Sequence, residues 1–118
     1  MQGRVNANFY YVREQAEVKG RLFQQALTDI ARAIILAPQE ATYYAEMASL
    51  QLRVNMADKA LQTAERCVAI APEYSEGYLL LGLAQIHLKD KEQGLANLRK
   101  ALGMGNGQAQ ALIDKYEK

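Results

Sequence analysis

The phrase Ile35-Leu36-Ala37-Pro38 returns as Ala69-Ile70-Ala71-Pro72, so the two prolines of this 118-residue chain stand 34 residues apart. The same offset aligns residues of similar size along most of the chain. Repetition at this period is the signature of a stacked helical array. The aligned columns are Tyr10 with Tyr44 and Tyr78, Ala26 with Ala60 and Gly94, Leu27 with Leu61 and Leu95, Ala33 with Cys67 and Ala101, Ile34 with Val68 and Leu102, and Leu36 with Ile70 and Met104.

Each repeat is predicted to form two helices joined by a short turn. Apolar residues recur at spacings of three and four in each half of the unit, which is the period of an amphipathic helix. Asn55 falls in the turn of the middle unit, where a left-handed backbone is usually wanted. Pro38 and Pro72 end the second helices of their units, because proline cannot continue the hydrogen-bond ladder. The sequence therefore predicts helical hairpins separated by fixed breaks.

The repeated columns resemble those of the tetratricopeptide repeat family. The third unit has Tyr78, Leu81-Gly82, Gly94 and Leu98; the second has Tyr44, Met47-Ala48, Ala60, Ala64 and Pro72; the first has Tyr10, Ala26, Ile30 and Pro38. The resemblance implies an all-α fold, a right-handed helical-hairpin solenoid of three such repeats. The expected units are residues 7–40, 41–74 and 75–108, in a single domain spanning 1–118 with a closing helix at 108–118.

The first unit departs most from the family pattern. Arg13 and Glu14 stand where the family places Leu-Gly, and Glu17 stands where it places Tyr. Small residues occupy the Gly column elsewhere, as Ala48 and Gly82, because two helix backbones approach closely there. These departures concern how tightly the first unit packs. Later departures are Gln51 and Gln85 in the Tyr column and Asn106 in place of the last Pro.

The composition of the chain limits the classes of protein to which it can belong. Half of the residues are hydrophobic, 23% are charged and the net charge is +1, which favours a packed domain and gives no electrostatic footprint for nucleic acid. One cysteine excludes an internal disulfide and a thiolate zinc cluster. No apolar run approaches the roughly 20 residues that span a bilayer. The stretch Met1 to Asn6 has no apolar run of signal-peptide type, so the cytoplasm is the default compartment and the question stays open.

The sequence offers no convergent set of catalytic groups, and we expect no enzyme, cofactor or metal. His87 falls at a helix end, where a cation meets the helix dipole favourably. Cys67 shares a column with two alanines and is predicted to be a small buried residue. Gly103 to Gly107 is predicted to stop a helix. The charged groups predicted to be solvated are Asp58 with Glu65, Asp90 with Glu92, and the basic cluster Lys89, Lys91, Arg99 and Lys100.

The family resemblance implies a concave groove, lined by the first helices of successive units, that binds a protein or peptide segment. One subgroup of the family grips chaperone tails with a clamp of Lys, Asn and Arg. The corresponding residues here are Tyr11, Gln15, Glu46, Glu76 and Leu80, so chaperone-tail binding is not expected. The repeat register gives the groove candidates Asn8, Tyr11, Gln15, Lys19, Thr42, Ala45, Ser49, Leu52, Arg53, Glu76, Leu79, Leu83, Ile86 and His87.

Two apolar regions leave alternatives open. Leu79, Leu83 and Ile86 are either buried by neighbouring helices or form an apolar ligand site. The run Phe9-Tyr10-Tyr11-Val12 has only Met1 to Asn6 before it, which suggests a homo-oligomer or an attached upstream domain. We therefore predict a non-catalytic protein-interaction scaffold. The alternatives are the structural end of a longer array or docking domain of a larger protein, and an accessory fragment of an enzyme.

Overall fold

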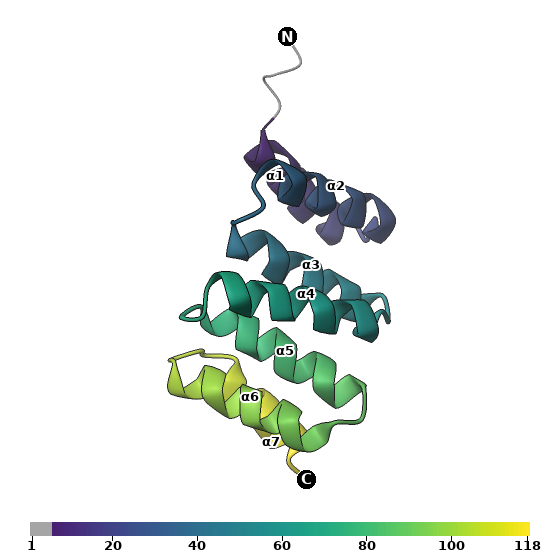
Figure 1. Ribbon diagram of the computed structural model, residues 1–118. Coiled ribbons are helices and arrows are strands. Elements are labelled where there is room, and N and C mark those ends of the chain that lie inside the picture. Colours follow the sequence, from purple (N-terminus) through teal and green to yellow (C-terminus); the bar gives the residue numbers. More distant parts are fainter. Residues whose placement is uncertain (1–5) are drawn as a thin grey trace.

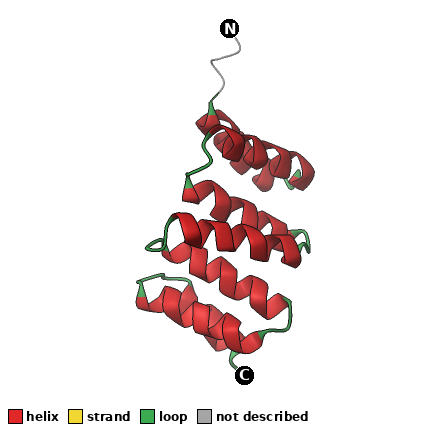
Figure 2. Ribbon diagram, viewed as in Figure 1, coloured by secondary structure: helices red, strands yellow, loops and turns green. Residues whose placement is uncertain are grey.

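The computed structural model describes residues 6–118, which form seven α-helices and no strand (Figures 1 and 2). Successive helices pair as hairpins, and the hairpins stack along the long axis of the array. The predicted all-α solenoid with a closing helix is confirmed. The expectations about a leader peptide and an upstream segment concern mainly Met1 to Val5, which lie outside the described residues. The helices are α1 (Ala7–Lys19), α2 (Phe23–Leu36), α3 (Ala41–Arg53), α4 (Ala57–Ile70), α5 (Ser75–His87), α6 (Lys91–Gly103) and α7 (Ala109–Tyr116).

The turn inside each hairpin has the same geometry. Arg21, Asn55 and Lys89 lie 34 residues apart and have φ angles of 61°, 65° and 72°. The left-handed backbone predicted at Asn55 is thus confirmed and is repeated in the other two hairpins. The next residue closes each first helix with an N–H bond to the carbonyl five residues earlier, as helix C-terminal motifs do. These bonds join Leu22 to Glu17, Met56 to Gln51 and Asp90 to Gln85, each at 2.8 Å.

The two helices of a hairpin approach most closely at the small-residue columns. A Cβ on Gly82 would lie 2.6 Å from the carbonyl oxygen of Gly94, and a Cβ on Gly94 would lie 2.7 Å from that of Gly82. The second hairpin uses Ala48 and Ala60, both fully buried, at the equivalent places. In the first hairpin the residue that corresponds to Ala48 is Glu14. A charged side chain therefore occupies a position at which the other hairpins have almost no side chain.

The closing helix α7 covers the apolar side of the third hairpin. Ile113 is 4% exposed and packs in one cluster with Leu79, while Leu112 and Tyr116 of α7 lie against the same cluster. Leu83 and Ile86 are half-buried against it as well. Of the two interpretations of these α5 residues, burial by a neighbouring helix is therefore correct. No helix within residues 6–118 has both the length and the apolar character that crossing a bilayer requires.

Cys67 lies in the core of the second hairpin. Its side chain is fully buried, and its Sγ donates to the carbonyl oxygen of Ala41 over 3.5 Å. Burial raises the pKa of the thiol to about 11. Because the thiolate is the reactive form of cysteine, this side chain is inert at neutral pH. The prediction of a small buried residue at this column is confirmed.

Candidate functional site

The first helices of the hairpins, α1, α3 and α5, follow one another along one side of the array, with α2, α4 and α6 on the other (Figure 1). A recess of about 190 Å³ opens between α1 and α3. We call it the α1–α3 recess, and it combines polar, charged and apolar walls. Its lining residues are Glu14, Val18, Glu46, Ser49, Leu50 and Arg53.

The structure brings several predicted groove residues to this recess. Ser49 and Arg53 line it directly and are exposed. On α1, the amide of Gln15 donates to the Tyr11 hydroxyl over 3.3 Å, and the Tyr11 ring lies 5.1 Å from the Tyr43 ring of α3. The two first helices are therefore joined by aromatic contact beside the recess.

The remaining groove candidates do not join this cluster. Asn8 and Lys19 are exposed on α1, and Thr42 is half-buried on α3. On α5 the polar candidates contact other residues of the chain. Glu76 accepts a bond from Asn106 over 3.2 Å, and His87 Nδ1 lies 2.8 Å from the carbonyl oxygen of Leu83. Leu79 is 2% exposed and packs in the core cluster that includes Ile113 of α7, and Leu83 lies half-buried against the same cluster.

Glu14 is the unusual member of the site. Its side chain is fully buried, and neither carboxylate oxygen has a hydrogen-bond donor among residues 6–118. Burial, with the charge of Glu46 next in importance, raises the pKa of Glu14 to about 8. Burial disfavours the charged form and a second carboxylate adds to this effect. The groove register did not include Glu14, Val18 or Glu46, although a carboxylate in the column of Ala48 and Gly82 signals such a site.

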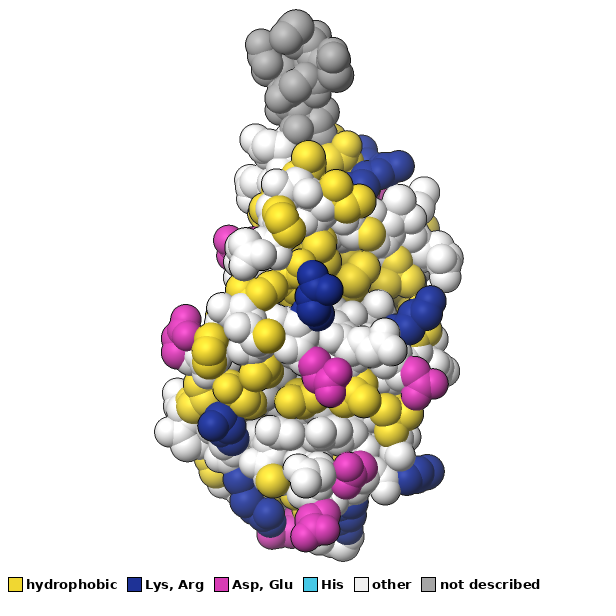
Figure 3. All heavy atoms as spheres, viewed as in Figure 1, with side chains coloured by type: hydrophobic (Ala, Val, Ile, Leu, Met, Phe, Trp, Pro, Cys, Tyr) yellow, Lys and Arg dark blue, Asp and Glu magenta, His cyan; other side chains and the backbone are white. Residues whose placement is uncertain are grey.

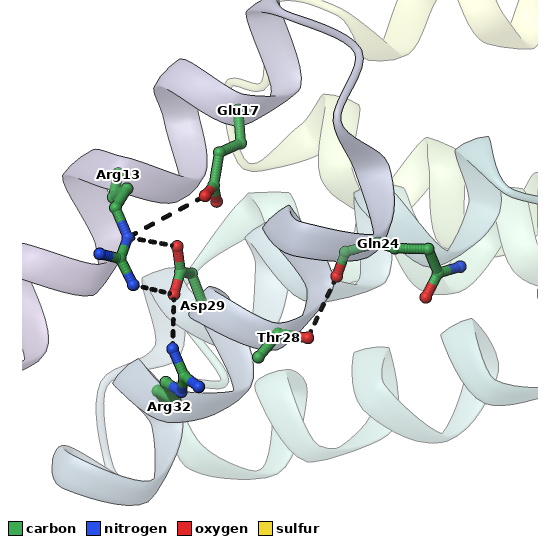
Figure 4. A network of polar contacts seen from close by, with 6 residues as sticks. All are labelled: Arg13, Glu17, Gln24, Thr28, Asp29 and Arg32. Atoms are coloured by element: carbon green, nitrogen blue, oxygen red, sulfur yellow. Dashed lines mark hydrogen bonds and ion pairs between the residues drawn. The ribbon is translucent and has the colours of Figure 1, made fainter.

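The neighbouring charges of the first hairpin are already paired with one another (Figure 4). Arg13 holds Asp29 through two bonds of 2.7 and 2.9 Å, and Arg32 reaches the same carboxylate at 3.3 Å. The hydrogen bonds from Arg13 hold the pKa of Asp29 below its ordinary value, whereas burial raises that of Glu17. This network lies between α1 and α2. Arg13 and Arg32 are thus directed away from the recess.

The network replaces a neutral bridge found in the other hairpins. Thr63 donates to Gln51 over 2.8 Å in the second hairpin, and Asn97 donates to Gln85 over 2.7 Å in the third. The residues 34 positions before Gln51 and Thr63 are Glu17 and Asp29. In the first hairpin an acidic pair replaces the neutral one: Arg13 and Arg32 bond to Asp29, and burial and then a hydrogen bond with Asp29 raise the pKa of Glu17.

A second, apolar surface occurs at the N-terminal end of the array. Phe9 is 46% exposed, Val12 54% and Ile35 75%. Figure 3 shows hydrophobic side chains gathered over α1 and α2, with acidic and basic groups intermingled over the rest of this face. An open hollow of about 400 Å³ between α2, α3 and α4 continues this surface, with Ile34, Ile35, Tyr44 and Met47 among its walls.

Groups that carry out catalysis or hold a metal do not converge in the described part of the chain. Cys67 is buried and inert, and the ring of His87 contacts a backbone carbonyl. Within residues 6–118, no cluster of three His, Cys, Asp or Glu side chains could hold a metal ion.

Known proteins of similar sequence and structure share this arrangement of helices. The chain is 30% identical over 96 residues to the small glutamine-rich tetratricopeptide repeat-containing protein 2 of Saccharomyces cerevisiae, covering 80% of this chain and 28% of that protein. The TPR domain of Arabidopsis OM64 superposes with a TM-score of 0.88 at 24% identity, over 94% of this chain and 93% of the other. The chain has the tetratricopeptide-repeat fold. No family model matches it.

Other tetratricopeptide-repeat structures are equally similar in shape. The first TPR of Spaghetti, bound to an HSP90 peptide, superposes with a TM-score of 0.88 at 18% identity, over 95% of this chain and 90% of that one. At this identity the likeness concerns the fold. The chain spans less than a third of the length of the curated relatives it matches.

Proposed function

We propose that this tetratricopeptide-repeat chain is a non-catalytic interaction module that binds a peptide segment along α1, α3 and α5. The α1–α3 recess supports the proposal, because Ser49 and Arg53, two of the groove residues predicted from the repeat register, are exposed in its walls beside apolar side chains. A neighbour of the same fold was solved with a peptide bound, which supports the same use here. Catalysis is not part of the proposal, since Cys67 is inert and no base converges on a nucleophile in the described residues.

The partner of this proposal is a protein rather than a nucleic acid. Acidic and basic side chains intermingle on the face that Figure 3 shows, and the net charge of +1 gives no electrostatic footprint for nucleic acid. Glu46 and Glu76 stand where the chaperone-tail binders of the family carry clamp residues for a carboxylate. Because like charges repel across an interface, we do not extend chaperone-tail binding to this chain.

A peptide selection tests the groove. A random library of peptides of about ten residues is selected on the immobilised chain, and the selected peptides are synthesised for affinity measurement. Ser49→Trp places a large ring in the recess at an exposed position and should weaken binding by at least about tenfold. Glu65→Trp changes an exposed residue of α4, on the other side of the array, and should leave affinity unchanged. Equal affinity of both variants for every selected peptide would contradict the proposal.

The apolar end of the array supports a second candidate function. Phe9 and Val12 are about half exposed on α1, and Ile35 and Leu36 are exposed at the end of α2, where they line an open hollow with Tyr10. Exposed apolar patches of this kind commonly mark contact surfaces. We propose that this face docks a second copy or another segment of a larger protein. Sedimentation equilibrium should show self-association that Phe9→Ser abolishes. A monomer at high concentration would leave only docking within a larger chain.

A further inference from the structure

The carboxylate of Glu14 presents a problem that the fold alone does not solve. Buried carboxylates in proteins are normally paired with a cation or several donors, because losing hydration is costly. Glu14 is fully buried in the wall of the α1–α3 recess, and no cation or N–H donor of residues 6–118 bonds to its oxygens. The hydrogen bond that helps to raise its pKa is shared with Glu46. Ala48 and Gly82 show that the same column is satisfied by a small residue. The glutamate therefore adds an ionisable group that hairpin packing does not require.

A second carboxylate faces the same space. Glu46 of α3 lines the recess opposite α1 and is half-buried. The two groups are close enough to influence each other and the Tyr11 hydroxyl, since burial and then both carboxylates raise the pKa of Tyr11. Two carboxylates and a phenol oxygen from adjacent helices thus concentrate negative potential at one point of the groove.

The chain does not neutralise this point with a cation of its own. Arg53 also lines the recess, but its guanidinium lies 5.7 Å from the centre of the Phe23 ring, and no ion pair within 4.0 Å joins it to either glutamate in the described structure. Arg13 and Arg32 are held by Asp29 on the other side of α1. None of these arginines is paired with Glu14 or Glu46. Glu14, whose pKa is raised to about 8 by burial and by Glu46, holds its proton at neutral pH, and the acidic pair is open to a cation from a partner that would replace this proton.

The other walls indicate what form that cation takes. Val18 and Leu50 give the recess apolar sides, and its volume of about 190 Å³ suits the end of one side chain. Lysine and arginine have apolar stems with a charged head, so they fit a recess with apolar walls and carboxylates. A lysine ammonium carries three donors and an arginine guanidinium five, enough to bond both glutamates. Two carboxylates supply too few ligands for a metal centre.

We propose that the α1–α3 recess binds a lysine or arginine side chain of the peptide partner, whose charged head donates hydrogen bonds to Glu14 and Glu46. The proposal rests on the proposed function, because it specifies the chemistry of the segment bound along α1, α3 and α5. Charge-assisted bonds of this kind are about twice as strong as neutral ones. The partner is thus a basic segment, opposite in charge to a chaperone tail.

A positional-scanning library tests this inference. Fluorescein-labelled peptide pools of about six residues, with both termini capped, each hold one residue fixed, so that side chains are the only source of fixed cations. Fluorescence polarisation should show that pools fixed as Lys or Arg at one position bind at least about tenfold more tightly than pools fixed as norleucine or glutamine. Glu14→Gln and Glu46→Gln should each reduce this preference below about threefold. Glu65→Gln, an exposed change on α4, is the matched control and should preserve it.

The outcomes separate the two proposals. Binding without preference for a basic residue would overturn this inference and leave groove binding intact. A preference for Lys or Arg that survives both glutamine variants would also overturn it, because the cation would then bind elsewhere. Failure of every pool to bind would contradict the proposed function and this inference together. Far-ultraviolet circular dichroism establishes that each variant is folded, and Glu46, being only half-buried, provides a second variant independent of the core.

Discussion

Replacing Glu14 with glutamine should stabilise the chain at alkaline pH. Glutamine matches the size of protonated glutamate, and it cannot acquire a charge in the buried site. The pKa of Glu14 rises from its ordinary 4.5 to about 8 in the folded chain, so the folded state binds more protons than the unfolded state between these values. Stability from this group is therefore complete at about pH 4.5 and is lost as the pH rises toward about 8.

The size of the effect follows from the two pKa values. Each pH unit between them is worth about 1.4 kcal/mol, which gives about 5 kcal/mol for full ionisation of Glu14 in the folded chain. Other groups around the site change this little. The raised pKa of Glu17 acts in the same direction, and the lowered pKa of Asp29 acts below the window. The pKa of Tyr11 is raised first by burial and then by Glu46, with Glu14 a smaller cause, and its ordinary value of 10.0 already lies above the window.

Urea unfolding followed by circular dichroism measures this at constant ionic strength, in unit steps from about pH 5 to about pH 9. The wild type should lose stability across the range, and Glu14→Gln should have a nearly flat profile. The two chains should agree within about 1 kcal/mol at the acidic end, and the variant should be more stable by several kcal/mol at the alkaline end. Glu65→Gln should follow the wild type. A wild-type profile that is flat, or a Glu14→Gln chain that is less stable at about pH 9, would refute this account of the buried carboxylate.

The remaining predictions concern packing and are measured by thermal and urea unfolding. Gly94→Ala places a Cβ 2.7 Å from the Gly82 carbonyl oxygen and should lower the free energy of unfolding by about 1–3 kcal/mol. Gly103→Ala, whose Cβ would have no atom within 4 Å, should leave this free energy unchanged or raise it. Equal effects of the two substitutions would contradict the close approach of the helices at Gly94. Cys67→Phe should cost a similar amount by overpacking and Cys67→Ala much less, so a stable phenylalanine variant would argue against a tight column. Ile113→Asp places an unpaired charge on the buried face of α7 and should lower the free energy of unfolding by about 3–5 kcal/mol. Binding of an apolar dye would then indicate that α7 has detached from the third hairpin.

Much of the fold was predictable because its determinants are local and periodic. The offset between Pro38 and Pro72 located the hairpins, and Asn55 marked the left-handed turn that Arg21 and Lys89 repeat. The groove register was partly informative, since Ser49 and Arg53 lie in the recess.

The repeat register did not show which groove candidates of α5 are covered. Helical spacing tells on which face of a helix a residue lies, but not which other helix packs against that face. Leu79 and Leu83 are on the expected face of α5, but α7 packs over them. Whether a closing helix folds back depends on the packing of Ile113 and Leu112, which is a tertiary contact. A helix such as α5, which is apolar nearly all the way round, is consistent both with a face covered by a closing helix and with a face open to a ligand.

The sequence by itself determined the repeat, the ends of the second helices just before Pro38 and Pro72, and the small-residue columns, because each depends on residues close in the chain or on a fixed period. It also displayed the charged residues of the first unit, without their partners. Only the tertiary structure decided that Arg13 turns to Asp29 of α2 while Glu14 remains unpaired beside Glu46 of α3. The reason is physical: which charges meet depends on the spacing and tilt of stacked hairpins, and side-chain packing sets both over distances that the period does not encode.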